Sequence, residues 1–421
     1  MQTLPLIPEW VSLEHQVAQI LTQQELHGWY FNEKEARKLE SALRREVEDT
    51  TSLLRRQFPF VAGTVFTPKR NNRTQGYVEG APFTRLKEFN PTSRDHIAWI
   101  LQTHCGWIPS LMTSKSNKPI IDEPVLKDIG TDIALAFLKI LEMTKALGMI
   151  SEGANAWQKL VTTSSRIHHH CSVATSTFRC AHRNPNLAQV PSDERFRKLF
   201  TASPNYVMVG ADLSGIELRL LAHYLARFDQ GRYAGILLTG DIHATNAEAI
   251  GVTRRQVKTI SYAFLYGAGD IKLGHTYDKQ LSDVEARKKG KEIRKAYIDA
   301  IPGLKELLEA VHKASERGYV RGLDNRRILV DSKHKSLNYL IQGSSAIIAK
   351  KWLVLANERL PKHTHQLAFI HDELQFETKK ENVNDLKFHL EYSAANAGEY
   401  YKLRIPIAAE SKSGSTWADV H

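Results

Sequence analysis

The sequence predicts an α+β fold in which two acid-bearing strand segments are separated by a long helical segment. Apolar residues recur at helical spacing through residues 12–56, whereas residues 161–190 are rich in β-forming and polar residues. Apolar runs within 207–226 and 366–377 have the character of buried strands, and residues 213–320 between them are largely helical in pattern. Helices and strands that occupy separate stretches of a chain are typical of α+β architecture.

The remaining elements follow in chain order. Residues 57–90 contain Pro, Gly and Asn and a basic cluster, Lys69, Arg70 and Arg73, which predicts a basic loop or a short hairpin. This segment is either a solvated connection or a DNA contact. Ser93 is a good N-cap for a helix over SRDHIAWILQTH, and helical patterning resumes at 131–148. A further helix over 338–359 leads to the second acidic strand.

Composition narrows the class of protein. The 421 residues carry 57 Lys+Arg against 46 Asp+Glu, a formal charge of +11, which favours a polyanionic partner over a merely basic soluble protein. No apolar run approaches the roughly 20 residues that span a bilayer, so no membrane association is expected. The start of the chain lacks the pattern of a secretory signal, and the 3 widely spaced cysteines predict neither a disulfide framework nor a Cys-x-x-Cys zinc site. A cytoplasmic location fits these features.

Two acidic motifs are the strongest indication of chemistry. In VMVGADLSGIELRLLAHYLA, Asp212 ends an apolar run and Glu217 follows in the next helix, and in QLAFIHDELQFE, Asp372 and Glu373 lie among β-formers. Strands that present carboxylates at one end can share divalent ions, and two-metal sites stabilise both oxygens of an in-line phosphoryl displacement. The motifs therefore predict a metal-dependent phosphoryl-transfer site.

A basic and aromatic helix lies between these motifs, in RRQVKTISYAFLYG. Arg254, Lys258, Tyr262 and Tyr266 recur every fourth position and so share one helix face. Arg and Lys can hold a triphosphate, and tyrosine rings give flat surfaces for a base. The pattern alone also fits an ordinary amphipathic helix with buried tyrosines.

The run His168–Cys171, HHHC, resembles a metal-binding sequence. Three consecutive histidines alternate between the faces of a strand and cannot all converge on one ion, so no zinc site is expected there.

Together these motifs resemble those of family A DNA polymerases, and within them the replicative polymerases of T-seven-like phages. DLSGIELR is similar to motif A of that family, RRQVKTISYAFLYG to motif B and HDE to motif C, and the resemblance includes RCAHRNPNLAQVP, LNYLIQG and GSTWADVH. In the phage branch it continues upstream through FNPTSRDHI at 89–97 and the GW-P segment at 106–109, so it covers nearly the whole chain. The resemblance implies a right-hand polymerase fold with a thumb, a palm built on an antiparallel sheet, and helical fingers. It implies an N-terminal segment and thumb at 1–155, palm at 156–225 and 338–421, and fingers at 226–337.

The resemblance also implies roles for single residues. Asp212 and Asp372 are expected to ligate two Mg²⁺ ions together with the backbone carbonyl of Leu213, with Glu373 beside them as a catalytic or structural acid. Residues expected to grip the incoming triphosphate are His243, Arg254 and Lys258, and Lys258 is also a candidate general acid for the leaving pyrophosphate.

Other implied roles concern the sugar, the base and the DNA. Glu217 matches a sugar gate that excludes the 2′-hydroxyl, Tyr262 implies acceptance of dideoxynucleotides, and Tyr266 is expected near the template base. The expected primer–template contacts are Arg179, His334, Asn338, Gln342 and His371. The family usually has Gly where this chain has Phe178, so the local path of that strand is open.

The predicted function is therefore DNA-templated 5′–3′ DNA synthesis from dNTPs. One alternative is a single-subunit RNA polymerase, which shares the two aspartates but lacks the acid at Glu217. The other is a non-catalytic DNA-binding accessory protein on a polymerase scaffold. The sequence shows no Asp-x-Glu exonuclease start, so proofreading is expected to be missing or supplied by a separate protein. The short 57–88 stretch makes a thioredoxin clamp an unlikely partner, leaving processivity to the basic cluster or to another protein.

Overall fold

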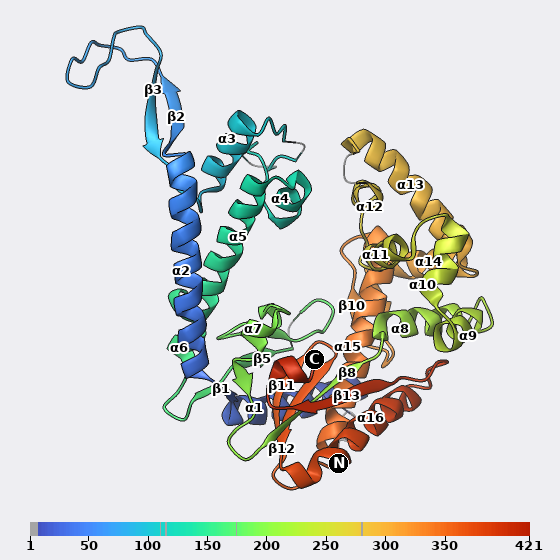
Figure 1. Ribbon diagram of the computed structural model, residues 1–421. Helices are drawn as coiled ribbons and strands as arrows, with labels where there is room; N and C mark the ends of the chain where they lie inside the picture. Colours follow the sequence, from blue (N-terminus) through green and yellow to red (C-terminus); the bar gives the residue numbers. More distant parts are fainter. Residues whose placement is uncertain (1–6, 110, 114–115, 174, 279–280) are drawn as a thin grey trace, which may run out of the picture. The chain divides into compact units, whose positions relative to one another are not determined.

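The computed structural model describes residues 7–109, 111–113, 116–173, 175–278 and 281–421, whose helices and strands are labelled in Figure 1. They form two compact units. The larger unit contains the described residues up to Glu33 together with Leu160–His421, and the smaller unit contains Lys34–Lys159. The boundary near 159 lies close to the expected one at 155, but the first helix belongs to the larger unit. The names thumb, palm and fingers stay predictions.

The smaller unit is mostly helical and carries one hairpin. Its elements are α2 (Glu33–Gln57), β2 (Phe60–Phe66), β3 (Phe83–Glu88), α3 (Arg94–His104), α4 (Glu123–Ile129), α5 (Asp132–Leu147), a π-helical turn (Gly148–Glu152) and α6 (Trp157–Leu160). The antiparallel pairing of β2 with β3 shows that the 57–90 segment is a hairpin. Ser93 caps α3 by accepting a hydrogen bond from the backbone N–H of His96, as the sequence predicted.

The helical pattern expected over 12–56 is confirmed except for an interruption at residues 28–32. Helix α1 (Glu9–His27) ends at Gly28, whose φ of 70° is a left-handed value that favours glycine. The short strand β1 (Trp29–Phe31) follows, and α2 begins after it. Trp29 and Phe31 are buried because β1 is the central strand of a small antiparallel sheet, between β4 (Arg166–Ile167) and β7 (Phe200–Thr201).

A four-stranded antiparallel sheet lies at the centre of the larger unit, in the order β11-β12-β8-β13. Its strands are β8 (Val207–Leu213), β11 (His365–Ile370), β12 (Glu373–Thr378) and β13 (Ala409–Gly414). Helix α1 contacts β11, and α16 (Val383–Tyr400) contacts β8 and β13, while α15 (Ser336–Asn357) packs against both helices.

The remaining elements of the larger unit are mainly helical, which confirms the α+β class and the long helical segment. They are two hairpins, β5 (His170–Ser172) with β6 (Ala181–Arg183) and β9 (Tyr319–Arg321) with β10 (Arg327–Leu329), the short helix α7 (Glu194–Arg197), and α8 (Ile216–Leu225), α9 (Arg232–Thr239), α10 (Ile242–Ile250), α11 (Arg254–Leu265), α12 (Asp270–Tyr277), α13 (Asp283–Ala300) and α14 (Leu304–Ser315). Short 3₁₀ turns complete the unit at Leu187–Gln189, Lys333–Lys335, Lys380–Asn382 and Trp417–Asp419.

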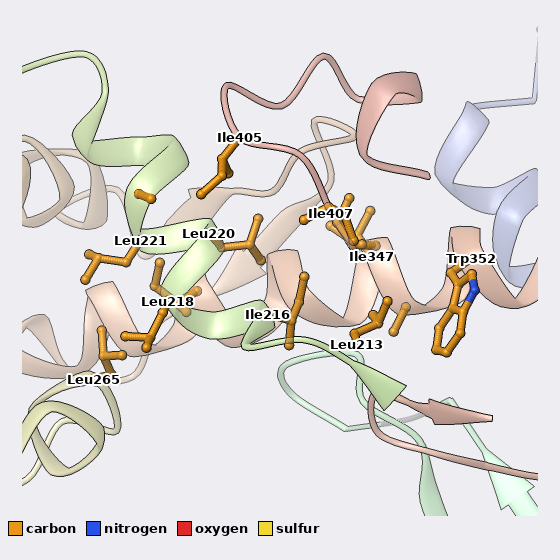
Figure 2. Close-up of a cluster of buried hydrophobic side chains, with 14 of the residues drawn as sticks. Leu213, Ile216, Leu218, Leu220, Leu221, Leu265, Ile347, Trp352, Ile405 and Ile407 are labelled. Carbon is orange, nitrogen blue, oxygen red and sulfur yellow. The ribbon is translucent and has the colours of Figure 1, made fainter. Parts of the chain in front are cut away.

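A continuous apolar core holds β8 and α8 onto α15. Figure 2 shows Leu213 and Ile216, on either side of the turn between β8 and α8, beside Ile347 of α15. All three side chains are buried, so the chain directly after Asp212 is anchored in the core. In the described part of the chain, no helix is both long enough and apolar enough to cross a membrane.

Candidate active site

The two acidic motifs meet at one end of the central sheet. Antiparallel pairing of β8 with β12 sets Asp212 opposite Glu373, and Asp372 lies in the two-residue turn that joins β11 to β12. The backbone N–H of Leu213 donates a hydrogen bond to the carbonyl of Asp372 at 3.0 Å. The aspartates, far apart in sequence, are therefore neighbours across two paired strands, as the prediction of a shared site requires.

The electrostatics of this pair favour a bound cation. Removal of surrounding water raises the pKa of Asp212 to about 7, and the negative charges of Asp372 and Glu373 add to the effect. Burial likewise raises the pKa of Asp372 to about 6, with Glu217 as the next cause. Asp212 remains exposed to solvent. An accessible group of carboxylates that repel one another has the oxygen-donor chemistry that suits Mg²⁺.

Glu373 differs from the two aspartates because its oxygens already have donors. It is 6% exposed and accepts hydrogen bonds from Gln375 Nε2 at 2.5 Å, Trp417 Nε1 at 2.7 Å and His421 Nδ1 at 3.1 Å. Burial alone would raise the pKa of Glu373, but these hydrogen bonds and the charge of His421 lower it. The contacts favour a positioning role, the structural option that the sequence left open.

A glycine makes room for this arrangement. Gly210 lies opposite Gln375 in the β8–β12 pair. A Cβ atom at position 210 would lie 2.6 Å from Gln375 Nε2 and 2.7 Å from the carbonyl oxygen of Val420. The absence of a side chain therefore lets the amide of Gln375 reach Glu373.

Glu217 links two residues, Arg179 and Tyr266, for which the sequence predicted separate roles. It lies in the first turn of α8 and is 9% exposed. Its Oε1 accepts from Arg179 Nη2 at 2.7 Å and from the hydroxyl of Tyr266 at 3.2 Å. A buried carboxylate with charge-assisted partners is held in one place, as a steric gate requires.

The shared face of α11 is confirmed. Arg254 and Lys258 are exposed and Tyr262 is half-buried, whereas Val257 and Ile260 on the opposite side of the helix are buried. Arg254 Nε donates to Asp241 Oδ2 at 2.6 Å, and Asp241 itself caps α10.

Tyr262 of α11 and Tyr266, which follows the last residue of that helix, lie near the carboxylate of Glu217. The rings of Tyr262 and Tyr266 stack with centroids 6.5 Å apart. Burial raises the pKa of the Tyr262 hydroxyl, and the nearby carboxylates of Glu217 and Asp372 raise it further. The ring of His243 lies 6.3 Å from that of Tyr262, and its Nδ1 is buried without a hydrogen-bond partner among the described residues.

Four further residues expected to contact DNA lie on or beside α15 and in the β11–β12 turn. Asn338 Nδ2 donates to the carbonyl of Tyr266 at 3.4 Å, and Asn338 and His334 line a cavity of about 370 Å³. Gln342 is half-buried one helical turn beyond Asn338 on α15. His371 begins the β11–β12 turn with a φ of 59°, next to Asp372.

Phe178, the departure from the family pattern, occupies a backbone conformation that normally favours glycine, with a φ of 62°. Its ring packs against the guanidinium of Arg326, whose carbon lies 4.8 Å from the ring centroid. Arg326 is 2% exposed and is held by Asp324 and Glu14. The segment that precedes Arg179 is therefore anchored by a cation–π contact with a buried ion cluster.

Sequence reasoning missed the residues that hold others in place. Gln375, Trp417 and His421 fix Glu373, and Asp241 pairs with Arg254. Gln375 lies two residues beyond Glu373 on the same strand, so alternation along β12 could have suggested it. Trp417 and His421 lie in GSTWADVH, which was recognised as similar to the family without a role for either residue.

Comparison with known proteins gives a consistent result. The family model described as DNA polymerase family A matches residues 70–419. The chain is 31% identical over 501 aligned residues to the DNA-directed DNA polymerases of Enterobacteria phage T3 and of Escherichia phage T7, covering 98% of this chain and 70% of each relative. Its fold is similar to the POL domain of Pol1 from M. smegmatis, solved with DNA primer-template and dNTP, with a TM-score of 0.79, 22% identity, and coverage of 96% of this chain and 70% of that one.

Proposed function

The chain belongs to DNA polymerase family A, and from that membership we propose that Asp212 and Asp372 form the centre of its nucleotidyl-transfer site. Its reaction is DNA-directed DNA synthesis, the activity for which the phage relatives are named. One observation supports the assignment of residues above all others: the hydrogen bond between Leu213 and Asp372 brings the two aspartates together at the open end of the sheet.

The donor set at this end fits divalent cations. Asp212, Asp372 and the carbonyl of Leu213 would hold two Mg²⁺, with Glu373 anchored behind them. When bound, the ions activate the primer 3′-hydroxyl and stabilise the leaving pyrophosphate.

The face of α11 would bind the incoming nucleotide. Arg254 and Lys258 are exposed cations one helical turn apart, and His243 lies beside Tyr262. Arg254 must exchange its pairing with Asp241 for a phosphate, which its planar guanidinium can bind with two parallel hydrogen bonds. The ammonium group of Lys258 is the candidate proton donor for pyrophosphate.

Glu217 would select the sugar. Its carboxylate is buried and accepts from both Arg179 and Tyr266, so it cannot move aside without breaking these bonds. A ribose 2′-hydroxyl placed against this carboxylate would therefore clash with it. The hydroxyl of Tyr262, whose pKa the charge of Glu217 raises, would replace the contacts that the 3′-hydroxyl makes when the incoming nucleotide is a dideoxynucleotide.

Primer–template DNA would contact the residues around Glu217 and on α15. Arg179 and Gln342 would meet acceptors on the minor-groove edge, which every base pair presents, and so test pairing rather than sequence. His334, Asn338 and His371 would complete this contact.

Primer extension with Mg²⁺ and dNTPs tests the assignment. Asp212→Asn and Asp372→Asn should each abolish extension while DNA binding, measured by fluorescence anisotropy, is largely retained. Glu248→Gln, which neutralises an exposed carboxylate on α10, is the matched control and should remain active. Full extension by both aspartate variants would refute the site.

Two further measurements separate the alternatives. Glu217→Ala should increase ribonucleotide incorporation relative to deoxynucleotide, whereas an RNA polymerase would prefer ribonucleotides before the change. An accessory protein would bind DNA and show no extension in the unmodified form. Missing proofreading stays a prediction for this chain, and metal-dependent shortening of a mismatched primer would contradict it.

A further inference from the structure

Three buried metal-ligating side chains converge outside the acidic site. His169, Cys171 and His182 each offer one ligand atom, and these atoms lie within 4.8 Å of one another. Their exposed fractions are 0%, 8% and 7%. Cys171 Sγ lies 3.1 Å from His182 Nδ1, and the two imidazole rings are nearly parallel, with centroids 6.0 Å apart.

The convergence follows from strand pairing. Cys171 of β5 is directly opposite His182 of β6, and His169 precedes Cys171 by two residues in extended chain, so it shares the same face. The neighbouring histidines bind elsewhere: His168 Nδ1 contacts the carbonyl of Glu25 at 2.7 Å, and His170 Nδ1 contacts its carboxylate at 2.9 Å. The three consecutive histidines alternate between faces, as the sequence predicted. His169 nevertheless joins a group of three ligands, because strand pairing brings His182 beside Cys171.

The ligand atoms of His169 and Cys171 share a contact with one amide nitrogen. Gln24 Nε2 lies 3.1 Å from His169 Nε2 and 3.7 Å from Cys171 Sγ, so one nitrogen contacts two of the three ligand atoms. A chain of side-chain amides orients the Gln24 amide so that its nitrogen, Nε2, is the donor. Asn357 Nδ2 donates to the carbonyl of Leu353 and to Gln366 Oε1, and Gln366 Nε2 donates to Gln24 Oε1. Hydrogens of the Gln24 amide thus occupy the place that a cation would take.

The two imidazole rings are in the protonation state that ligation needs, whereas burial raises the pKa of the Cys171 thiol, so a cation must displace its proton. Burial lowers the pKa of His169 to about 3 and that of His182 to about 4, so both rings are neutral at pH 7 and keep a lone pair. The unused ring nitrogens, His169 Nδ1 and His182 Nε2, are buried and have no hydrogen-bond partner within the described ranges. Such orphaned groups are uncommon in protein interiors.

We propose that His169, Cys171 and His182 form a binding site for a thiophilic divalent cation of the Zn²⁺ class, separate from the magnesium-binding carboxylates. Zinc bonds of about 2.0 Å to nitrogen and 2.3 Å to sulfur set ligand atoms about 3.3–3.8 Å apart, so the widest pair must close by about 1 Å. Cys171 releases its thiol proton to the buffer on binding. The Gln24 amide gives way, and the fourth position is open to its oxygen or to water.

The site would position the catalytic turn. The ring of His182 packs edge-on against that of His371, with centroids 6.2 Å apart, and His371 immediately precedes Asp372. A cation that cross-links β5 and β6 would hold His182 in place and so stabilise the conformation of this turn. Its role is structural, since none of its ligands reaches the acidic group.

The test uses the purified full chain, stripped of metal and kept reduced, in excess Mg²⁺ so that the carboxylates are occupied. Zinc chloride is titrated and bound zinc is measured by mass spectrometry after gel filtration. We expect one tightly bound zinc per chain and a higher melting temperature. Cys171→Ser should weaken zinc binding by more than about 100-fold, because it removes a direct ligand rather than an outer-shell partner. Cys180→Ser, which alters another buried cysteine, is the matched control and should bind as the unmodified chain does.

Cobalt substitution keeps the test decisive if Cys171→Ser does not fold. Co²⁺ bound to a thiolate gives an intense near-ultraviolet charge-transfer band, which carboxylate ligation does not. The unmodified chain should show this band at one equivalent of Co²⁺, and Zn²⁺ should displace it. Absence of the band, or zinc binding by folded Cys171→Ser as tight as that of the unmodified chain, would overturn the proposal.

Discussion

Replacing Asp212 with asparagine should stabilise the metal-free protein at alkaline pH even as it removes catalysis. The ordinary pKa of an aspartate, 3.8, rises to about 7 at this position through loss of water and repulsion by Asp372 and Glu373. A carboxyl whose pKa is higher in the folded than in the unfolded state binds its proton more tightly when folded. Folding is therefore unaffected by this group at acid pH, is progressively opposed between about pH 4 and pH 7, and bears the full penalty above pH 7.

The size of the penalty follows from the same values. A rise from 3.8 to about 7 corresponds to about 4 kcal/mol at most. Because Asp212 is exposed, solvent screening reduces this to about 1–2 kcal/mol. The penalty develops between pH 3.8 and about pH 7, and about two-thirds of this interval lies above pH 5. The unfolding free energy of Asp212→Asn relative to the unmodified protein should therefore increase by about 1 kcal/mol between pH 5 and pH 8.

Urea unfolding in EDTA, followed by tryptophan fluorescence at both pH values, measures this difference. Glu248→Gln serves again as the control and should track the unmodified protein at each pH. Adding Mg²⁺ at pH 8 should stabilise the unmodified protein more than the Asp212→Asn variant, since the ion relieves the repulsion. An advantage that is the same at pH 5 and pH 8, or a variant that is less stable at pH 8, would refute the electrostatic reasoning.

Three other substitutions test neighbouring features. Tyr262→Phe should lower the incorporation of dideoxynucleotide relative to deoxynucleotide by about tenfold, the worth of one hydrogen bond, and an unchanged ratio would contradict the role of the hydroxyl. Glu373→Gln should retain measurable primer extension where Asp372→Asn does not, because its oxygens bind protein donors; equal loss would make it a catalytic acid. Glu377→Gln should destabilise the fold by about 2–3 kcal/mol, because the fully buried carboxylate pairs with Arg166 and His27. Burial alone would raise the pKa of Glu377, but hydrogen bonds from His27, Ser203 and Arg166 lower it from 4.5 to about 2. This difference in unfolding free energy should therefore be present above pH 4.5 and shrink as the pH falls toward 2.

Features that depend on nearby residues were predictable. Ser93 caps α3 as expected, and Arg254, Lys258 and Tyr262 share one face of α11, because helical geometry links positions three or four apart. The strand that carries Asp212 was also recognisable, since its apolar residues are buried on both faces of the sheet.

Features that depend on distant strands were not predictable in the same way. The break in the first helical stretch occurs at Trp29, where β1 pairs with strands that lie more than a hundred residues further along the chain. The expectation that His168–Cys171 forms no zinc site likewise considered one strand alone. Periodicity within one strand correctly separated the consecutive histidines, but the position of His182 is decided by strand pairing.

The sequence by itself determined the family, the order of helices and strands around the acidic motifs, and the identity of the acids, because these are carried by residue types and short-range spacing. Only the tertiary structure decided which of these carboxylates are held by hydrogen-bond donors and which stay accessible. Asp212 stays accessible among like charges, Glu373 is kept ionised by hydrogen bonds from Trp417 and His421, and Glu217 is clamped by Arg179. The physical reason is that desolvation and ion pairing depend on distances between side chains from separate elements, which packing sets and local sequence does not encode.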